Sequence, residues 1–96
     1  MQVIYHSEAE AELIEAAEFY ESRLRGLGVD FLTTVDSAVS VIQTHPERFP
    51  VVEGDIRRCR LSRFPYCIYY RREDESVRIL VVKHHSRHPN YWKGRN

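Results

Sequence analysis

The sequence predicts one small α+β domain over residues 1–96. An N-terminal strand and a helical hairpin come first, followed by a three-stranded antiparallel meander, with the helices packed on one face of the sheet. Three observations support this fold class. Two early stretches carry apolar residues at spacings of three and four, three β-rich runs follow in the second half with turn signals between them, and 96 residues are too few for two separate cores.

The first half should form a strand and two antiparallel helices. Residues Gln2–His6 are partly β-branched and favour a strand, and Ser7 is placed to cap the helix over residues 9–24. This helix carries a row of acids that we expect to face solvent: Glu8, Glu12, Glu15 and Glu18. Gly26-Leu27-Gly28 ends it. A second apolar stripe then starts near Asp30 and runs to His45-Pro46, because the residue before a proline disfavours helical dihedrals.

The second half should form the sheet. Two prolines and a glycine predict a loop over residues 46–55. Strands are expected at 56–61, 66–72 and 77–83, joined by short turns. The last is a nearly continuous apolar run, so we expect it to be the central strand, covered on both faces. Beyond His85, Pro89 and Gly94 oppose a regular element.

The charge is divided between the halves. The net charge is zero, but residues 1–50 carry nine acids and three bases, whereas residues 51–96 carry eleven bases and five acids. This division marks a face that meets an anion, or else the two halves simply neutralise each other across the fold. The two cysteines, Cys59 and Cys67, lie in strand-like runs without metal-ligand spacing, which favours reduced, buried thiols.

No apolar run reaches the ~20 residues of a membrane-spanning helix. The acids from Glu8 to Glu21 stand where a signal peptide would need an apolar core. We therefore expect a cytoplasmic protein that does not associate with membranes.

The order of elements, together with the segments RRCRLSRFPYCIYYRRED and VRILVVKHHSRHP, resembles the RelE/ParE toxin superfamily over nearly the whole chain. The resemblance implies the toxin of a bacterial type II toxin–antitoxin system, associated with growth inhibition and plasmid stabilisation, with a cognate antitoxin as its partner. RelE-like members are similar to ribosome-dependent mRNA endoribonucleases. ParE-like members are similar to inhibitors of DNA gyrase, which need no catalytic centre.

Cutting RNA requires a base, an acid and cations for the phosphate charge. Arginine can bond two phosphate oxygens at once, and histidine transfers protons near neutral pH. A tyrosine near the C-terminus resembles the one that RelE-type nucleases use. If the chain is a nuclease, the catalytic candidates are therefore Arg60, His85, Arg87 and Tyr91. The residues expected to bind the target or the antitoxin are Arg58, Arg60, Arg63, Arg71, His88 and Trp92. We expect no metal ion and no small-molecule cofactor.

One departure favours the gyrase inhibitor over the nuclease. RelE-type nucleases usually carry an arginine after the tyrosine that opens the middle strand of the meander, whereas Cys67 follows Tyr66 here. A thiol cannot stabilise a phosphate dianion. A ParE-like interaction with gyrase is thus the first hypothesis, and an RelE-like mRNA endoribonuclease is the alternative. Two plainer interpretations stay open: the arginines form a solvated strand edge, and Trp92 pins the tail to the domain.

Overall fold

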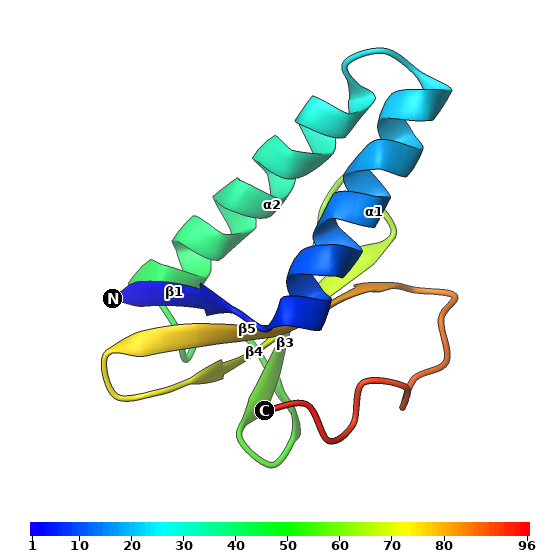
Figure 1. The fold of residues 1–96 in the computed structure, drawn as a ribbon. Helices are drawn as coiled ribbons and strands as arrows, with labels where there is room; N and C mark the ends of the chain where they lie inside the picture. The colour runs from blue at the N-terminus through cyan, green and yellow to red at the C-terminus, as the bar shows by residue number, and fades with distance from the viewer.

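The computed structural model describes residues 1–96 as a two-layer α+β fold. The elements in chain order are β1 (Gln2–Tyr5), α1 (Ser7–Arg23), α2 (Leu27–Thr44), β2 (Val51–Glu53), β3 (Ile56–Arg60), β4 (Tyr66–Arg72) and β5 (Ser76–His84). The helical hairpin covers one face of the sheet, and its tip projects beyond it (Figure 1). The predicted fold class is therefore confirmed.

The sheet contains two features that the sequence analysis missed. Its strand order is β1-β5-β4-β3-β2, with β1 parallel to β5 and all other pairs antiparallel. The meander therefore has four strands, because Val51 pairs with Arg57 inside the stretch predicted as a loop. Gly54 makes the tight turn with a positive φ of 56°. The prediction that residues 77–83 form the central strand is wrong, because β4 is the middle strand and β5 lies between it and β1.

The helix ends also differ from the prediction. His6, and not Ser7, caps α1, since its Nδ1 accepts a hydrogen bond from the Glu8 amide at 3.1 Å. Helix α2 begins at Leu27, directly after Gly26. The Glu21 carboxylate accepts hydrogen bonds from the amides of Gly26 and Gly28, both at 2.9 Å, and these bonds lower the pKa of Glu21. Neither helix combines the length and the apolar composition that crossing a membrane requires.

The main core lies between the helices and the sheet. Fully buried side chains from α2, β4 and β5 meet there: Phe31, Val35, Ile42, Ile68, Tyr70, Val77 and Ile79. A smaller cluster covers the other face of the sheet: Ile56, Cys67, Tyr69, Leu80, Val81 and Trp92. Strand β5 is thus covered on both faces, as expected. Both cysteines are free and buried, Cys59 in the main core and Cys67 in the smaller cluster. Burial raises the pKa of Cys59 to about 11, so its thiol is unreactive.

At Gly28 the two helices lie too close together for a side chain to fit between them. A Cβ atom there would lie 2.5 Å from the Ala17 carbonyl oxygen and 2.9 Å from the Glu21 Cβ. We expect Gly28→Ala to lower the free energy of unfolding by about 2 kcal/mol, because the helices must separate to admit the methyl group. Urea denaturation followed by circular dichroism measures this loss.

Val29→Ala is the control for this prediction. Val29 is the next residue on α2 and is 63% exposed, so its truncation should change stability by less than about 0.5 kcal/mol. A Gly28→Ala variant as stable as the wild type would show that the helices do not touch at this position.

Candidate functional site

A carboxylate from α1 completes the hydrogen bonding of β5. Strand β1 pairs with β5 only as far as Tyr5, opposite Ile79. Beyond that point the edge of β5 has no strand beside it. The Val82 amide instead donates a hydrogen bond to Glu12 Oε1 at 3.1 Å. Because a buried backbone amide without a partner is costly, this contact explains why a glutamate can be buried on the helix face that packs against β5.

Arg95, from the C-terminal tail, binds the same carboxylate. Its Nη1 lies 2.8 Å from Glu12 Oε1 and its Nη2 lies 3.1 Å from Oε2. The Nη1 atom also donates to the Leu80 carbonyl at 3.1 Å, on the same edge of β5. Both charged side chains are only 9% exposed. A two-point bond of this kind is the geometry in which an arginine compensates a buried carboxylate best.

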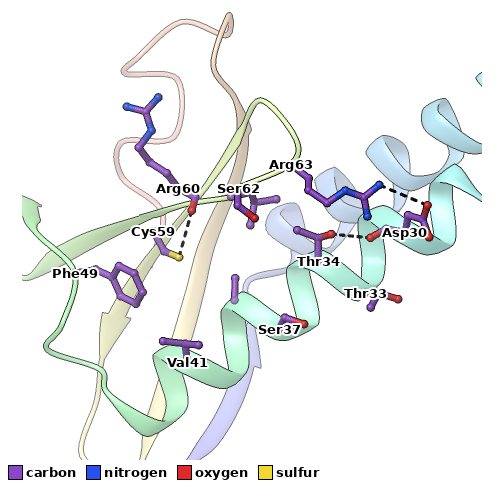
Figure 2. A pocket seen from close by; sticks show the side chains of 12 residues that line it. Asp30, Thr33, Thr34, Ser37, Val41, Phe49, Cys59, Arg60, Ser62 and Arg63 are labelled. Carbon is purple, nitrogen blue, oxygen red and sulfur yellow. Dashed lines mark hydrogen bonds and ion pairs between the residues drawn. The ribbon is translucent and has the colours of Figure 1, made fainter.

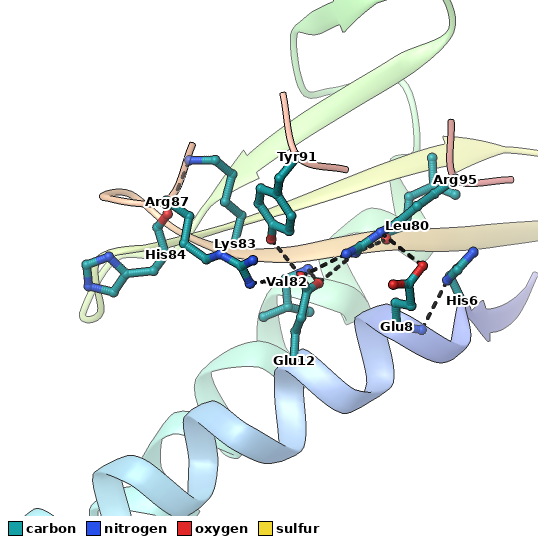
Figure 3. Close-up of polar contacts among 10 residues, drawn as sticks. All are labelled: His6, Glu8, Glu12, Leu80, Val82, Lys83, His84, Arg87, Tyr91 and Arg95. Carbon is teal, nitrogen blue, oxygen red and sulfur yellow. Dashed lines mark hydrogen bonds and ion pairs between the residues drawn. The ribbon is translucent and has the colours of Figure 1, made fainter. Parts of the chain in front are cut away.

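Two further tail residues complete this group, which we call the Glu12 cluster: Glu12, Arg87, Tyr91 and Arg95 (Figure 3). The Tyr91 hydroxyl donates to Glu12 Oε2 at 2.6 Å. The Arg87 guanidinium lies 3.8 Å from the centre of the Tyr91 ring and 3.6 Å from Glu12 Oε2. Burial and the neighbouring carboxylate raise the pKa of Tyr91, so its hydroxyl remains a protonated donor.

Trp92 holds the tail against the face of the sheet that the helices leave uncovered. Its ring packs on Tyr69 with 4.9 Å between ring centres, and only 4% of the residue is exposed. Next to it, Lys93 forms an ion pair of 2.8 Å with Glu53 of β2. This placement favours the interpretation in which Trp92 pins the tail. A role for Trp92 in binding a partner stays a prediction.

A group of cations lies on the same uncovered face. The strand register places Arg60 opposite Cys67 and Cys67 opposite Lys83, so these side chains form one row across β3, β4 and β5. Arg58 lies two residues from Arg60 on β3 and therefore points to the same side. None of Arg58, Arg60 and Lys83 forms an ion pair with an acid of this chain.

The other predicted binding residues are dispersed. Arg63 lies 3.7 Å from Asp30 of α2, and Arg71 lies 3.0 Å from Asp55. The Nδ1 atom of His88 accepts a hydrogen bond from the Asn90 amide within the tail. These contacts stabilise local structure and do not bring the three residues together.

His85, another predicted catalytic residue, lies close enough to Arg60 and Lys83 for their charges to act on it. Its amide donates to the Pro65 carbonyl at 2.9 Å, at the end of β5. Burial lowers the pKa of His85, and the charge of Arg60 lowers it further. The ring is therefore neutral at physiological pH. The structure thus groups the four nuclease candidates in two places, with Arg87 and Tyr91 at Glu12, and Arg60 and His85 at the cation row.

An open groove of about 410 Å³ separates α2 from β3 and the loop that follows it. Thr34, Val41 and Phe49 line its sides, and the Arg63–Asp30 ion pair lies across one end (Figure 2). The Arg60 side chain points away from α2 and out of this groove. No three His, Cys, Asp or Glu side chains lie close enough together to hold a metal ion.

Comparison with known proteins decides the family. The sequence model described as "ParE toxin of type II toxin-antitoxin system, parDE" matches residues 3–89. The chain belongs to the ParE toxin family. The resemblance to RelE/ParE toxins is therefore confirmed. A solved structure described as "Chromosomal ParDE TA system from P. aeruginosa" shares the fold, with a TM-score of 0.74 and 19% identity over 88% of this chain and 95% of that one. No curated protein sequence matches the chain.

The ParE match ends at Pro89, so Tyr91, Trp92 and Arg95 lie beyond the residues it covers. These are the residues through which the tail contacts Glu12 and Tyr69. Sequence reasoning placed Glu12 in a solvated acidic row, which is wrong. Its spacing matches that of Glu8 and Glu15, and only the path of a tail more than 70 residues away decides which acid is buried.

The Glu12 cluster predicts a large effect from one neutral substitution. In Glu12→Gln the buried Arg95 loses its two-point bond to a carboxylate and keeps only the 3.7 Å ion pair with the exposed Glu8, while the size of the side chain is kept. We expect the free energy of unfolding to fall by about 3 kcal/mol, because a buried charge that loses its closest counterion is strongly destabilising. Urea denaturation at neutral pH measures the loss.

Glu15→Gln makes the same chemical change one turn along α1, at an exposed position. This control should cost less than about 0.5 kcal/mol. Equal effects from the two substitutions would mean that the Glu12 contacts contribute no more than a surface charge does.

Proposed function

We propose that this ParE-family chain inhibits bacterial growth by binding DNA gyrase in the cytoplasm, and that a cognate antitoxin holds it inactive. The observation that carries the proposal is the family match over residues 3–89, most of the chain. Inhibition by binding requires a surface of suitable shape and charge, without a base and an acid aligned on one phosphate.

The positions of the nuclease candidates favour binding over catalysis. RNA cleavage would need Arg60, Arg87 and Tyr91 to converge on one phosphate. Arg87 and Tyr91 are instead bonded to Glu12, and Arg60 lies in another group, on the sheet face away from the helices. Because the pKa of Tyr91 is raised, its hydroxyl stays protonated near neutral pH and is not available as a base. The RelE-like endoribonuclease remains the competing outcome of the test below.

Three features suit a protein partner such as an antitoxin. The groove beside α2 can receive part of a chain. All three residues of β2 are exposed, and this strand is a free edge of the sheet, to which an extended segment can add by backbone hydrogen bonds. Several apolar side chains are exposed on the helical hairpin: Ile14, Phe19, Leu24, Val29 and Leu32. A small domain with such surfaces would be stabilised by a bound partner.

Induced expression in a bacterial host tests the proposal, with DNA supercoiling and protein synthesis followed separately. We expect plasmid supercoiling to change and cells to filament before protein synthesis falls. Co-expression of the small reading frame beside this gene should restore growth. An early arrest of protein synthesis with cleaved mRNA would instead establish the nuclease. Expression that leaves growth unaffected would contradict the toxin assignment altogether.

Arg87→Ala and His85→Ala separate the two mechanisms further. A nuclease that used these side chains should lose activity by 10²-fold or more. A gyrase inhibitor that does not use them should keep its effect on supercoiling, once the amount of folded protein is matched between variants by circular dichroism.

A further inference from the structure

Lys83 is a buried cation without a counterion. It is 6% exposed, and its Nζ donates only to the neighbouring His84 carbonyl, at 3.2 Å. Figure 3 shows its side chain leaving β5 on the side away from α1. A buried ammonium needs more compensation than one carbonyl supplies. Arg95 offers the contrast within this chain, since its side chain is also largely buried but is bonded to Glu12 at two points.

Two more cations lie around the same place. Arg60 is in the row that contains Lys83, and Arg58 is in the next row along β3. The charges of all three act on the Cys67 thiol: burial raises the pKa of Cys67, and Arg58, Arg60 and Lys83 oppose that rise. Three cations therefore surround one small region of the sheet without an acid of this chain among them.

Two buried N–H groups beside these cations also lack a partner. The Nε atom of Arg58 and the Nε1 atom of Trp92 make no hydrogen bond. Both flank Tyr69, since Arg58 lies opposite it on the neighbouring strand and Trp92 packs against its ring. Buried N–H groups are almost always bonded in native proteins. These two donors mark a place where this chain supplies too few acceptors.

We propose that Lys83, Arg58, Arg60 and Trp92, together called the Lys83 site, bind the carboxylate of an aspartate or glutamate side chain from the antitoxin. The proposal rests on the proposed function and names a contact within it. A carboxylate accepts up to four hydrogen bonds, which suits a small group of cations and N–H donors. Because β2 pairs with β3, a segment that adds to the free edge of β2 runs one strand away from the strand that carries Arg58 and Arg60.

A nucleic-acid phosphate is the less suitable occupant. Binding a polyanion draws on many cations spread over a long surface. This chain has a net charge of zero, and most cations of its second half are already paired with acids. A single carboxylate requires only the local group.

Lys83→Met tests the site because it removes the charge and keeps the length of the side chain. Free toxin, separated from the co-purified antitoxin with denaturant and refolded, is titrated with that antitoxin. We expect the Kd to rise at least tenfold, while the Tm of the free variant equals or exceeds that of the wild type, since an uncompensated charge has been removed. Arg72→Met, at the end of β4 far from Cys67 and 47% exposed, is the matched control and should leave the Kd unchanged.

The outcomes separate this proposal from the proposed function. An unchanged Kd in Lys83→Met, or a lower Tm that explains a weaker Kd, overturns the site. If Lys83→Met binds a short single-stranded oligonucleotide more weakly than the wild type does, but binds the antitoxin equally well, the carboxylate assignment is overturned. If the wild type binds no antitoxin, the proposed function fails. The site then stands only if acetate, compared with chloride at equal ionic strength, raises the Tm of the wild type and not that of Lys83→Met.

Discussion

The buried carboxylate of Glu12 is the constraint on which the arrangement of this protein depends. Strand β1 is shorter than β5, so the edge of β5 lacks a strand partner beyond Ile79. Glu12 supplies an acceptor to that edge, and a buried carboxylate in turn requires a cation. Arg95 provides this cation and also donates a hydrogen bond to the Leu80 carbonyl. Because the end of β5 lacks a strand partner, Glu12 of α1 and Arg95 of the tail both bind there, and these contacts connect the helix and the tail to the sheet.

The charge division in the sequence is largely neutralised within the fold, and the interpretation in which it marks a face that meets an anion stays a prediction. Seven of the eleven cations in the second half form ion pairs with acids, four of them with acids of the first half, so most of the division is neutralised across the fold. Four cations remain without an acid: Arg57 donates to the backbone carbonyls of Glu47 and Phe49, whereas Arg58, Arg60 and Lys83 lie together on the face away from the helices. Most opposing charges thus meet within the chain, and three of the unpaired cations make up the site proposed for the antitoxin carboxylate.

Local patterns in the sequence predicted most of the helices and strands. They could not predict the positions of residues whose contacts lie in distant parts of the chain. Apolar spacing predicted both helices, and β-rich runs predicted the three longer strands. Strand β2 was not predicted, because Pro50 and Gly54 flank a stretch that is too short to show the alternation of apolar and polar residues typical of a strand. Glu12 shares its spacing with exposed acids, and Arg95 follows a glycine in an irregular tail. Their pairing spans 83 residues, which no periodicity records.

Trp92 is the single tryptophan of the chain and lies in the tail, so its fluorescence shows when the tail leaves the sheet. It therefore tests whether Glu12 connects the helix, the strand and the tail. The most direct measurement compares two urea transitions, one from Trp92 fluorescence and one from the helical circular dichroism. The wild-type curves should coincide, whereas in Glu12→Gln the fluorescence transition should come at lower urea, as the tail leaves before the helices unfold. Separate transitions in the wild type, or coincident ones in Glu12→Gln, would contradict this account.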